Sequence, residues 1–284
     1  MKFTKMHGAG NDYVYVNGFD QHFDWSELSR FVSNRHTGIG SDGLIVAQES
    51  DSAHLKMTMF NGDGSEGEMC GNGIRCLVAF AIDEGIVDPE AEFQTVETKA
   101  GELLVRPIID RDSMVGASVS MGVPILEPSL IPVDIPNEPY PILDYPLEIE
   151  GYQLSLAFVS MGNPHAVAFI EESVDAFPLD KIGPIVENHP LFPNRVNFEI
   201  NNVNSKHQIT TRVWERGSGL TMACGTGACA VVVAAALKGV VDEKVEVELP
   251  GGTLTIGWQK GDSEVIMTGP VQTVFKGELD WPLT

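Results

Sequence analysis

Two long apolar runs dominate the hydrophobic pattern of this chain. Residues 71–84 and 225–238 are apolar around most of a helical circumference, and each run is followed by a glycine suited to a left-handed C-cap, Gly85 or Gly239. A helix that is apolar on nearly all sides must be buried, so we predict two helices that are each wrapped by strands. A third, amphipathic helix is predicted over residues 25–34.

Most of the remaining chain has the pattern of strands. Alternating or β-branched runs predict strands at residues 13–16, 44–47, 55–60, 155–160, 167–170, 209–214 and 245–249. Long helices are few in comparison. The chain is therefore predicted to be an α+β protein rich in sheet.

The sequence around the two apolar helices is duplicated. Cys70-Gly71-Asn72-Gly73 and Cys224-Gly225-Thr226-Gly227 stand at their starts, 154 positions apart. The same offset carries Phe60 onto Trp214, Gly85 onto Gly239, Val87 onto Val241 and Asp88 onto Asp242. We predict two pseudo-symmetric domains, each a β-sheet wrapped around a central helix, rather than a solenoid with a period of about 20 to 50 residues.

A proline-rich stretch near the middle of the chain marks the predicted domain crossover. Its seven prolines are Pro124, Pro128, Pro132, Pro136, Pro139, Pro141 and Pro146, a density that excludes a helix or a central strand. We predict an N-terminal domain at residues 1–121 that carries Cys70, and a C-terminal domain at residues 122–267 that carries Cys224. Residues 268–284 are expected to return to the first domain as a strand.

Composition and charge narrow the class of protein. The chain has 284 residues, 43% of them hydrophobic, which suffices for two cores. Its 18 basic residues face 40 acidic ones, and a net charge of −22 argues against nucleic-acid binding. No signal peptide follows Lys2 and Lys5, and no apolar stretch approaches the ~20 residues of a membrane span. We expect a cytoplasmic protein with reduced thiols.

The positions of the two cysteines suggest their chemistry. Each precedes a helix start, where unpaired N–H groups and the helix dipole favour negative charge, so we expect the thiol pKa to fall toward neutrality. The N–H groups of Gly71, Asn72, Gly225 and Thr226 are expected to bind a carboxylate. Inverting a carbon centre requires a base on one face and an acid on the other, and two thiols supply both without a cofactor.

Eight motifs spread along nearly the whole chain carry a resemblance to a known family. They are residues 6–12 (MHGAGND), 34–36 (NRH), 61–65 (NGDGS), 70–73 (CGNG), 160–165 (SMGNPH), 195–197 (RVN), 215–217 (ERG) and 223–228 (ACGTGA). With them the chain resembles the diaminopimelate epimerases, which are cofactor-independent isomerases. The resemblance implies that family's fold, interconversion of LL- and meso-diaminopimelate in lysine biosynthesis, and a homodimer.

The resemblance also implies roles for individual residues. Cys70 is expected as proton donor and Cys224 as acceptor in the direction that starts from the LL isomer. The positions that would bind substrate are Asn11, Asn61, Asn163, Asn197, Glu215 and Arg216. His165 and Glu215 would modulate the thiol pKa values. One departure is Gly43, which stands where some members have glutamine and has no side chain to reach substrate.

Other motifs have simpler interpretations. The GxGxxG pattern at residues 38–43 enters a predicted strand instead of opening a helix, so dinucleotide binding is not expected. Cys76 and Cys229 lie inside the apolar helices and are expected to pack there. No CxxC pair and no histidine cluster indicates zinc. Two rival functions stay open: a proline or hydroxyproline racemase on the same fold, and an inactive amino-acid-binding module.

Overall fold

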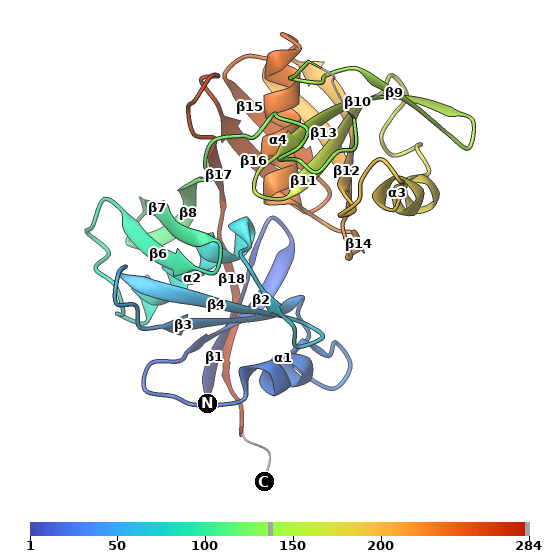
Figure 1. Cartoon of the computed structure of the whole chain (residues 1–284). Coiled ribbons are helices and arrows are strands. Elements are labelled where there is room, and N and C mark those ends of the chain that lie inside the picture. The colour runs from blue at the N-terminus through green and yellow to red at the C-terminus, as the bar shows by residue number, and fades with distance from the viewer. Residues whose placement is uncertain (136–138, 282–284) are drawn as a thin grey trace. The chain divides into compact units, whose positions relative to one another are not determined.

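The chain divides into two compact units. The computed structural model describes residues 1–135 and 139–281, so Pro136 and the last three residues of the predicted returning segment lie outside it (Figure 1). Unit 1 comprises Met1–Ser120 and Thr268–Thr284, and unit 2 comprises Met121–Met267. The first boundary falls between Ser120 and Met121, just before the proline-rich segment.

Unit 1 is built around one mixed sheet. Its strands are β1 (Lys2–Gly8), β2 (Asn11–Asn17), β3 (Gly43–Gln48), β4 (Leu55–Asn61), β5 (Glu66–Gly67), β6 (Gln94–Thr98), β7 (Gly101–Asp110), β8 (Ser113–Ser120) and β18 (Gln272–Glu278). Pairing runs β18-β1-β2-β3-β4-β6-β7-β8, parallel between β2 and β3 and between β4 and β6, and antiparallel elsewhere. The returning strand β18 thus lies against β1.

Two helices complete unit 1. The helix α2 (Gly71–Asp83) contacts β1, β2, β3, β7 and β8, and eleven of its residues are buried. The helix α1 (Trp25–Ser33) is amphipathic, begins at the N-cap Asp24 and packs on β3 and β4. The sheet therefore surrounds α2, with the helix start carrying Cys70 at one end (Figure 1).

Unit 2 repeats this plan. Its strands are β9 (Tyr145–Ile149), β10 (Tyr152–Ser160), β11 (Pro164–Phe169), β12 (Asn197–Ser205), β13 (Gln208–Glu215), β14 (Gly219–Leu220), β15 (Lys244–Leu249) and β16 (Gly252–Gly257), and β17 (Ile266–Pro270) crosses the unit boundary. Pairing runs β9-β10-β11-β12-β13-β15-β16, parallel between β11 and β12 and between β13 and β15. The central helix α4 (Gly225–Leu237) contacts β10, β11, β12, β15 and β16, and the helix α3 (Leu179–Glu187) packs on β13.

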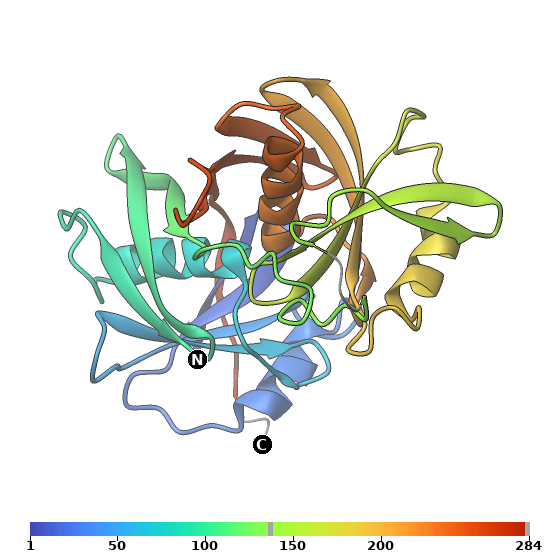
Figure 2. The same ribbon diagram turned by 45° about the horizontal axis from the view of Figure 1, so that its top comes forward.

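Element by element, the two units correspond. Strands β1 to β4 in unit 1 and β10 to β13 in unit 2 pair in the same order, antiparallel, then parallel, then antiparallel. In each run a helix, α1 or α3, connects the second strand to the third. The central helix, α2 or α4, then connects the fourth strand to its parallel neighbour, β6 or β15. Figure 2 shows each central helix flanked by strands of its own unit. The predicted α+β class with two pseudo-symmetric domains is confirmed. The duplicated sequence is thus a duplicated topology.

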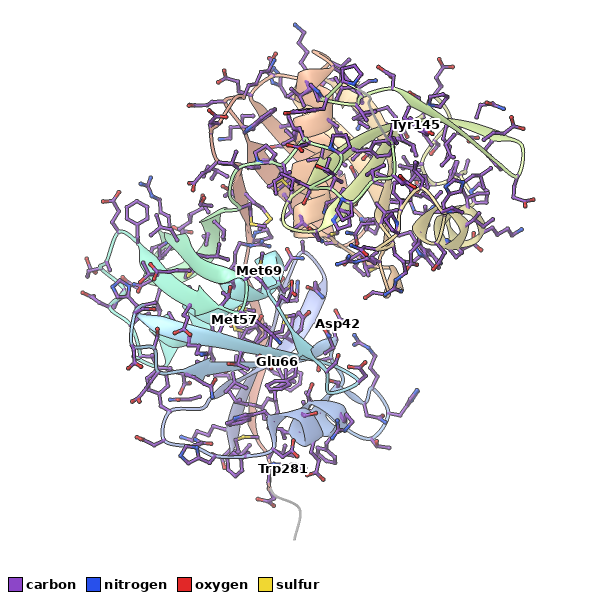
Figure 3. All side chains as sticks on the ribbon, viewed as in Figure 1. Asp42, Met57, Glu66, Met69, Tyr145 and Trp281 are labelled. Carbon is purple, nitrogen blue, oxygen red and sulfur yellow. The ribbon has the colours of Figure 1, made fainter. Side chains whose placement is uncertain are left out.

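Hydrophobic packing differs between the two central helices. The α4 helix is composed almost wholly of Ala, Val and Gly, whereas α2 also holds Arg75, which is fully buried. The core of unit 2 beside α3 is rich in aromatic rings, among them Phe158, Phe177 and Phe198. Side chains cover both units densely, as Figure 3 shows around the labelled Met57 and Tyr145.

Candidate active site

Cys70 is the N-cap of α2. Its Sγ accepts a hydrogen bond from the Gly73 N–H at 3.3 Å, and its thiol donates to Asn11 Oδ1 at 3.1 Å. The side chain is half-buried. As the first residues of the helix, Gly71 and Asn72 have N–H groups without an intrahelical acceptor. The cysteine and these N–H groups therefore lie together at the start of α2.

Asp42 fixes the orientation of Asn11. Asn11 Nδ2 donates to Asp42 Oδ2 at 2.7 Å, which leaves Asn11 Oδ1 to face Cys70. Arg35 Nη2 in turn donates to Asp42 Oδ1 at 2.9 Å and to Asp12 Oδ1 at 2.8 Å. Figure 3 labels Asp42 in the loop that precedes β3. Neither acidic residue was among the predicted site residues.

Tyr13 is a further neighbour of Cys70 that the sequence reading missed. Burial, and next the charge of Cys70 and a hydrogen bond to it, raise the pKa of the Tyr13 phenol well above its ordinary value. Tyr13 pairs with Gly43 across β2 and β3. A Cβ added at Gly43 would lie 2.1 Å from Phe60 O and 2.9 Å from Tyr13 Cε1. The glycine at this position therefore follows from packing of the strands.

Cys224 occupies the matching place at the start of α4. Its Sγ accepts a hydrogen bond from the Gly227 N–H at 3.3 Å and lies 3.4 Å from Thr226 Oγ1. The residue is 5% exposed, so it is more deeply buried than Cys70. Gly225 is also buried, whereas Thr226 is half-buried.

The expected lowering of the thiol pKa is wrong for Cys224. Burial is the largest effect on this thiol, followed by the charges of Glu215 and Glu199, and together they raise its pKa well above the ordinary value. The hydrogen bonds from Thr226 and the Gly227 N–H act in the opposite direction but are outweighed. A helix N-terminus lowers a thiol pKa only where the thiol keeps enough solvent, and Cys224 does not.

A chain of polar side chains lies behind Cys224. His165 Nδ1 is 2.7 Å from Glu199 Oε1, and His165 Nε2 is 3.0 Å from Asn163 Oδ1. Asn163 Nδ2 donates to Thr226 Oγ1 at 3.2 Å. His165 and Glu199 are fully buried. The predicted residues Asn163, His165 and Thr226 therefore belong to one network with Cys224, together with Glu199, which was not predicted.

The remaining predicted residues have varied surroundings. Asn197 is 3% exposed and uses its amide within the protein, donating to Pro164 O at 2.8 Å and accepting from the Arg216 N–H at 2.9 Å. The exposed Arg216 side chain donates to Asn194 O at 3.2 Å. Glu215 accepts a hydrogen bond from Thr221 at 2.5 Å. Asn197 therefore positions the backbone of Arg216 in this structure.

Asn61 belongs to the first unit and stands at the end of β4. Its exposed side chain donates to Ser65 Oγ at 3.0 Å. Leu44 pairs with Phe60 in unit 1 and Phe198 with Trp214 in unit 2, and the offset of 154 that relates these pairs carries Asn61 onto Glu215. Asn61 and Glu215 are thus equivalent positions in the two units.

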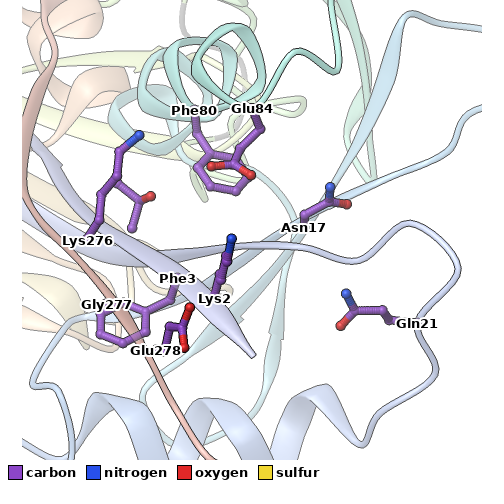
Figure 4. Close-up of a pocket in the computed structure, with 10 residues that line it drawn as sticks. Lys2, Phe3, Asn17, Gln21, Phe80, Glu84, Lys276, Gly277 and Glu278 are labelled. Atoms are coloured by element: carbon purple, nitrogen blue, oxygen red, sulfur yellow. The ribbon is translucent and has the colours of Figure 1, made fainter.

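A cavity of about 440 Å³ lies at the other end of α2 from Cys70. Figure 4 shows Lys2, Phe80, Glu84 and Lys276 around it, and Phe80 and Glu84 stand at the C-terminal end of the helix. A helix of this length separates its ends by roughly 20 Å. The cavity is therefore distinct from the thiol site.

Within the described residues, no group of three or more His, Cys, Asp or Glu side chains is arranged to hold a metal ion. Nor does the described part of the chain contain a helix with the length and apolarity needed to cross a bilayer.

Comparison with known proteins agrees with this geometry. The family model of diaminopimelate epimerase matches residues 3–126 and 157–274, which covers both cysteine helices. The chain belongs to the diaminopimelate epimerase family. A diaminopimelate epimerase from Methanococcus maripaludis is 50% identical over 281 residues, covering 99% of this chain and 100% of that protein. A second family member, from Acetivibrio thermocellus, is 49% identical over 99% of each chain.

Solved structures of more distant proteins share the fold. A phenazine biosynthesis protein of the PhzF family from Bacillus anthracis has a TM-score of 0.69 at 15% identity, covering 98% of each chain. A hydroxyproline epimerase from Agrobacterium vitis has a TM-score of 0.68 at 16% identity, covering 98% of this chain and 90% of that one. The predicted diaminopimelate epimerase-like fold is therefore confirmed.

Proposed function

We propose that this chain interconverts LL- and meso-diaminopimelate by moving one α-proton between Cys70 and Cys224. The observation that carries the proposal is the pair of equivalent helix N-termini, each capped by a cysteine whose sulfur accepts an N–H hydrogen bond at 3.3 Å. Family members about 50% identical over the whole chain are named for this activity. The isomerase class, diaminopimelate as substrate and a place in lysine biosynthesis follow from that membership.

The proposed chemistry needs one thiol on each face of the reacting carbon. In the LL direction Cys224 removes the α-proton as a thiolate, and Cys70 delivers the proton of its thiol to the opposite face. The N–H groups at the starts of α2 and α4 would bind the adjacent carboxylate and stabilise the enediolate charge, through Gly71, Asn72, Gly225 and Thr226. No cofactor takes part in these steps.

Recognition of the distal end of the substrate is assigned to polar side chains. Asn11, Asn61, Asn163, Asn197, Glu215 and Arg216 match the family positions expected to bind it. The exposed Arg216 guanidinium can pair with a carboxylate, and Asn61 offers an exposed amide. Asn197 would contribute by holding the Arg216 backbone.

Residues 1–121 and 268–284 are proposed as the epimerase half that carries Cys70, and residues 122–267 as the half that carries Cys224. We also propose a cytoplasmic homodimer. Val274 and Phe275 of β18 are 52% and 45% exposed, and a partner subunit would bury such apolar side chains.

The test follows the α-proton directly. The reduced protein is incubated with meso-diaminopimelate in D₂O, the α-proton signals are followed by NMR, and proline serves as the control substrate. We expect loss of the diaminopimelate signal, appearance of the LL isomer, and no exchange with proline. Exchange of proline alone would favour the racemase alternative, and exchange of neither would favour the binding module.

Variants of each thiol extend this test. Cys70→Ser and Cys224→Ser should each reduce epimerisation by at least about a hundredfold, the range of positioned proton transfer. Cys229→Ser, which changes a buried cysteine in α4 outside the proposed chemistry, is the matched control.

A further inference from the structure

The two units differ in the residue that lies beneath the first turn of the central helix. A Cβ added at Gly73 would meet Ile45 Cδ1 at 2.5 Å, and a Cβ added at Gly227 would meet Glu199 Oε1 at 2.8 Å. Gly73 and Gly227 are the equivalent residues that donate to the two cysteines. Ile45 and Glu199 thus occupy matching places, one apolar and one carboxylate.

Strand register gives the same correspondence. In unit 1, β2 and β3 pair Tyr15 with Ile45, and in unit 2, β11 and β12 pair Val167 with Glu199. The preceding inward position on the second strand of each unit is Tyr13 or His165. The unit that carries Cys224 therefore has a titratable pair where the other has a phenol and an aliphatic side chain.

Glu199 is costly for the fold. It is fully buried, and its Oε2 has no hydrogen-bond partner among the described residues. Burying a carboxylate costs free energy that an apolar side chain does not, and Ile45 fills the matching place without that cost. Packing alone therefore gives no reason for a glutamate here, whereas its contact with His165 does.

A chain of hydrogen bonds through His165, Asn163 and Thr226 links Glu199 to Cys224. Both ring nitrogens of His165 face oxygen atoms, with Glu199 Oε1 at Nδ1 and Asn163 Oδ1 at Nε2. Asn163 then presents Nδ2 to Thr226 Oγ1. Because Thr226 accepts that bond, its own proton is available to the sulfur 3.4 Å away.

We propose that Glu199 is a positioning residue for Cys224: it holds His165 as a double donor, which orients Asn163 and Thr226 so that the Thr226 hydroxyl donates to the sulfur when it is a thiolate. The first unit has no such carboxylate beneath Gly73, and there the thiol of Cys70 itself donates to an asparagine oxygen. The two thiols are therefore unequal in the free protein. The inference rests on the proposed function only in taking Cys224 as a reacting thiol.

The charges near Cys224 affect whether alkylation becomes faster or slower when Glu199 is replaced. Glu199 and Glu215, from β12 and β13, are the carboxylates that act on Cys224, and His165 on β11 faces Glu199. As an isolated charge, Glu199 would disfavour the thiolate, so its removal would speed alkylation. As the anchor of the donor chain it favours the thiolate, so its removal would slow alkylation.

The experiment measures the rate at which iodoacetamide alkylates each cysteine between pH 7 and 9, without substrate, using mass spectrometry of the separate peptides. Below the midpoint of its titration, a thiol reacts in proportion to its thiolate fraction. We expect Thr226→Val to slow Cys224 about tenfold, the effect of losing one hydrogen bond to a charged sulfur. In the Thr226→Val background, Glu199→Gln removes only a repelling charge and should speed alkylation. With Thr226 present, Glu199→Gln also removes the hydrogen bond from the hydroxyl, so its gain in rate should be smaller by about the same tenfold factor.

Three controls make the outcome specific. Thr226→Ser retains the hydroxyl and should restore the original rate. Glu248→Gln changes a half-buried carboxylate elsewhere in unit 2 and should leave Cys224 unaffected. The rate at Cys70 should not change in any variant.

An equal change in rate from Glu199→Gln with and without the Thr226 hydroxyl would overturn the proposal. If Glu199→Gln fails to fold, the comparison of Thr226→Val with Thr226→Ser decides, and equal rates in those two would overturn it. Because no diaminopimelate is used, this result is independent of whether the proposed reaction is correct.

Discussion

Replacing Gly227 with alanine tests how tightly the carboxylate of Glu199 is held beneath α4. The new Cβ would lie 2.8 Å from Glu199 Oε1 and 3.2 Å from Cys224 Sγ, so the carboxylate or the helix start must shift, which disturbs the contact of Glu199 with His165. Leaving a buried carboxylate without its partner costs about 3–5 kcal/mol, and the better helix propensity of alanine offsets about 1 kcal/mol. We expect Gly227→Ala to destabilise the fold by roughly 2–4 kcal/mol.

The equivalent variant in unit 1 is the matched comparison. At Gly73 the added Cβ would meet Ile45 Cδ1 at 2.5 Å and Met57 Cε at 3.3 Å, which are the movable ends of apolar side chains. Overpacking of this kind costs about 1–3 kcal/mol before the same gain of about 1 kcal/mol, so Gly73→Ala should lose roughly 0–2 kcal/mol. Urea unfolding followed by circular dichroism measures both. Equal stability of Gly227→Ala and the original chain, or a larger loss in Gly73→Ala, would refute the reasoning.

Three further predictions concern buried groups. Burial raises the pKa of Cys76 from 9.0 to about 11, so the unfolded chain loses this proton first, and the free energy of unfolding falls by about 2–3 kcal/mol as pH rises from 9 to 11. Cys76→Ala should flatten that decline in urea unfolding at pH 9, 10 and 11. An unchanged slope would contradict this prediction. Gly43→Gln should lower the melting temperature without tightening substrate binding, because its Cβ has no room beside Phe60 O; a calorimetric gain in affinity would refute this. Burial alone would raise the pKa of Asp12, but hydrogen bonds from Arg35 and Lys5 bring it below its ordinary value. Asp12→Asn should therefore lower the free energy of unfolding by about 3–5 kcal/mol at neutral pH. This loss of stability should shrink as pH falls through the lowered pKa, and a loss independent of pH would exclude the ionic explanation.

Local sequence signals were sufficient for the central helices. The predicted ranges 71–84 and 225–238 exceed α2 and α4 by one residue each, because they include the C-cap residues Glu84 and Lys238. The cysteine N-caps and the glycines that follow the C-caps mark both helices in the sequence. The strand β12 was missed because Asn197–Ser205 reads as polar, with Glu199 and Asn201 on the buried side. The helix α3 was missed because Pro184 interrupts its pattern.

The sequence predicted only those site residues that belong to recognisable local motifs. Cys70, Cys224 and the glycines beside them carry their chemistry in local spacing. Glu199 does not, because in sequence it is one acidic residue within a short polar segment. Only the pairing of β11 with β12 places it under Gly227. The available signal was the offset of 154, which aligns Glu199 with Ile45 and exposes the difference between the halves.

The return of β18 to unit 1 has a consequence for synthesis on the ribosome. The strand β1 pairs with β2 and with β18, so one of its two neighbours is translated only after all of unit 2. Unit 2 is continuous in sequence and can complete its sheet while unit 1 still has an open edge at β1. Since domains generally fold as units in the order in which they become complete, unit 2 is expected to reach its native state before unit 1, which must wait for β18 to leave the exit tunnel.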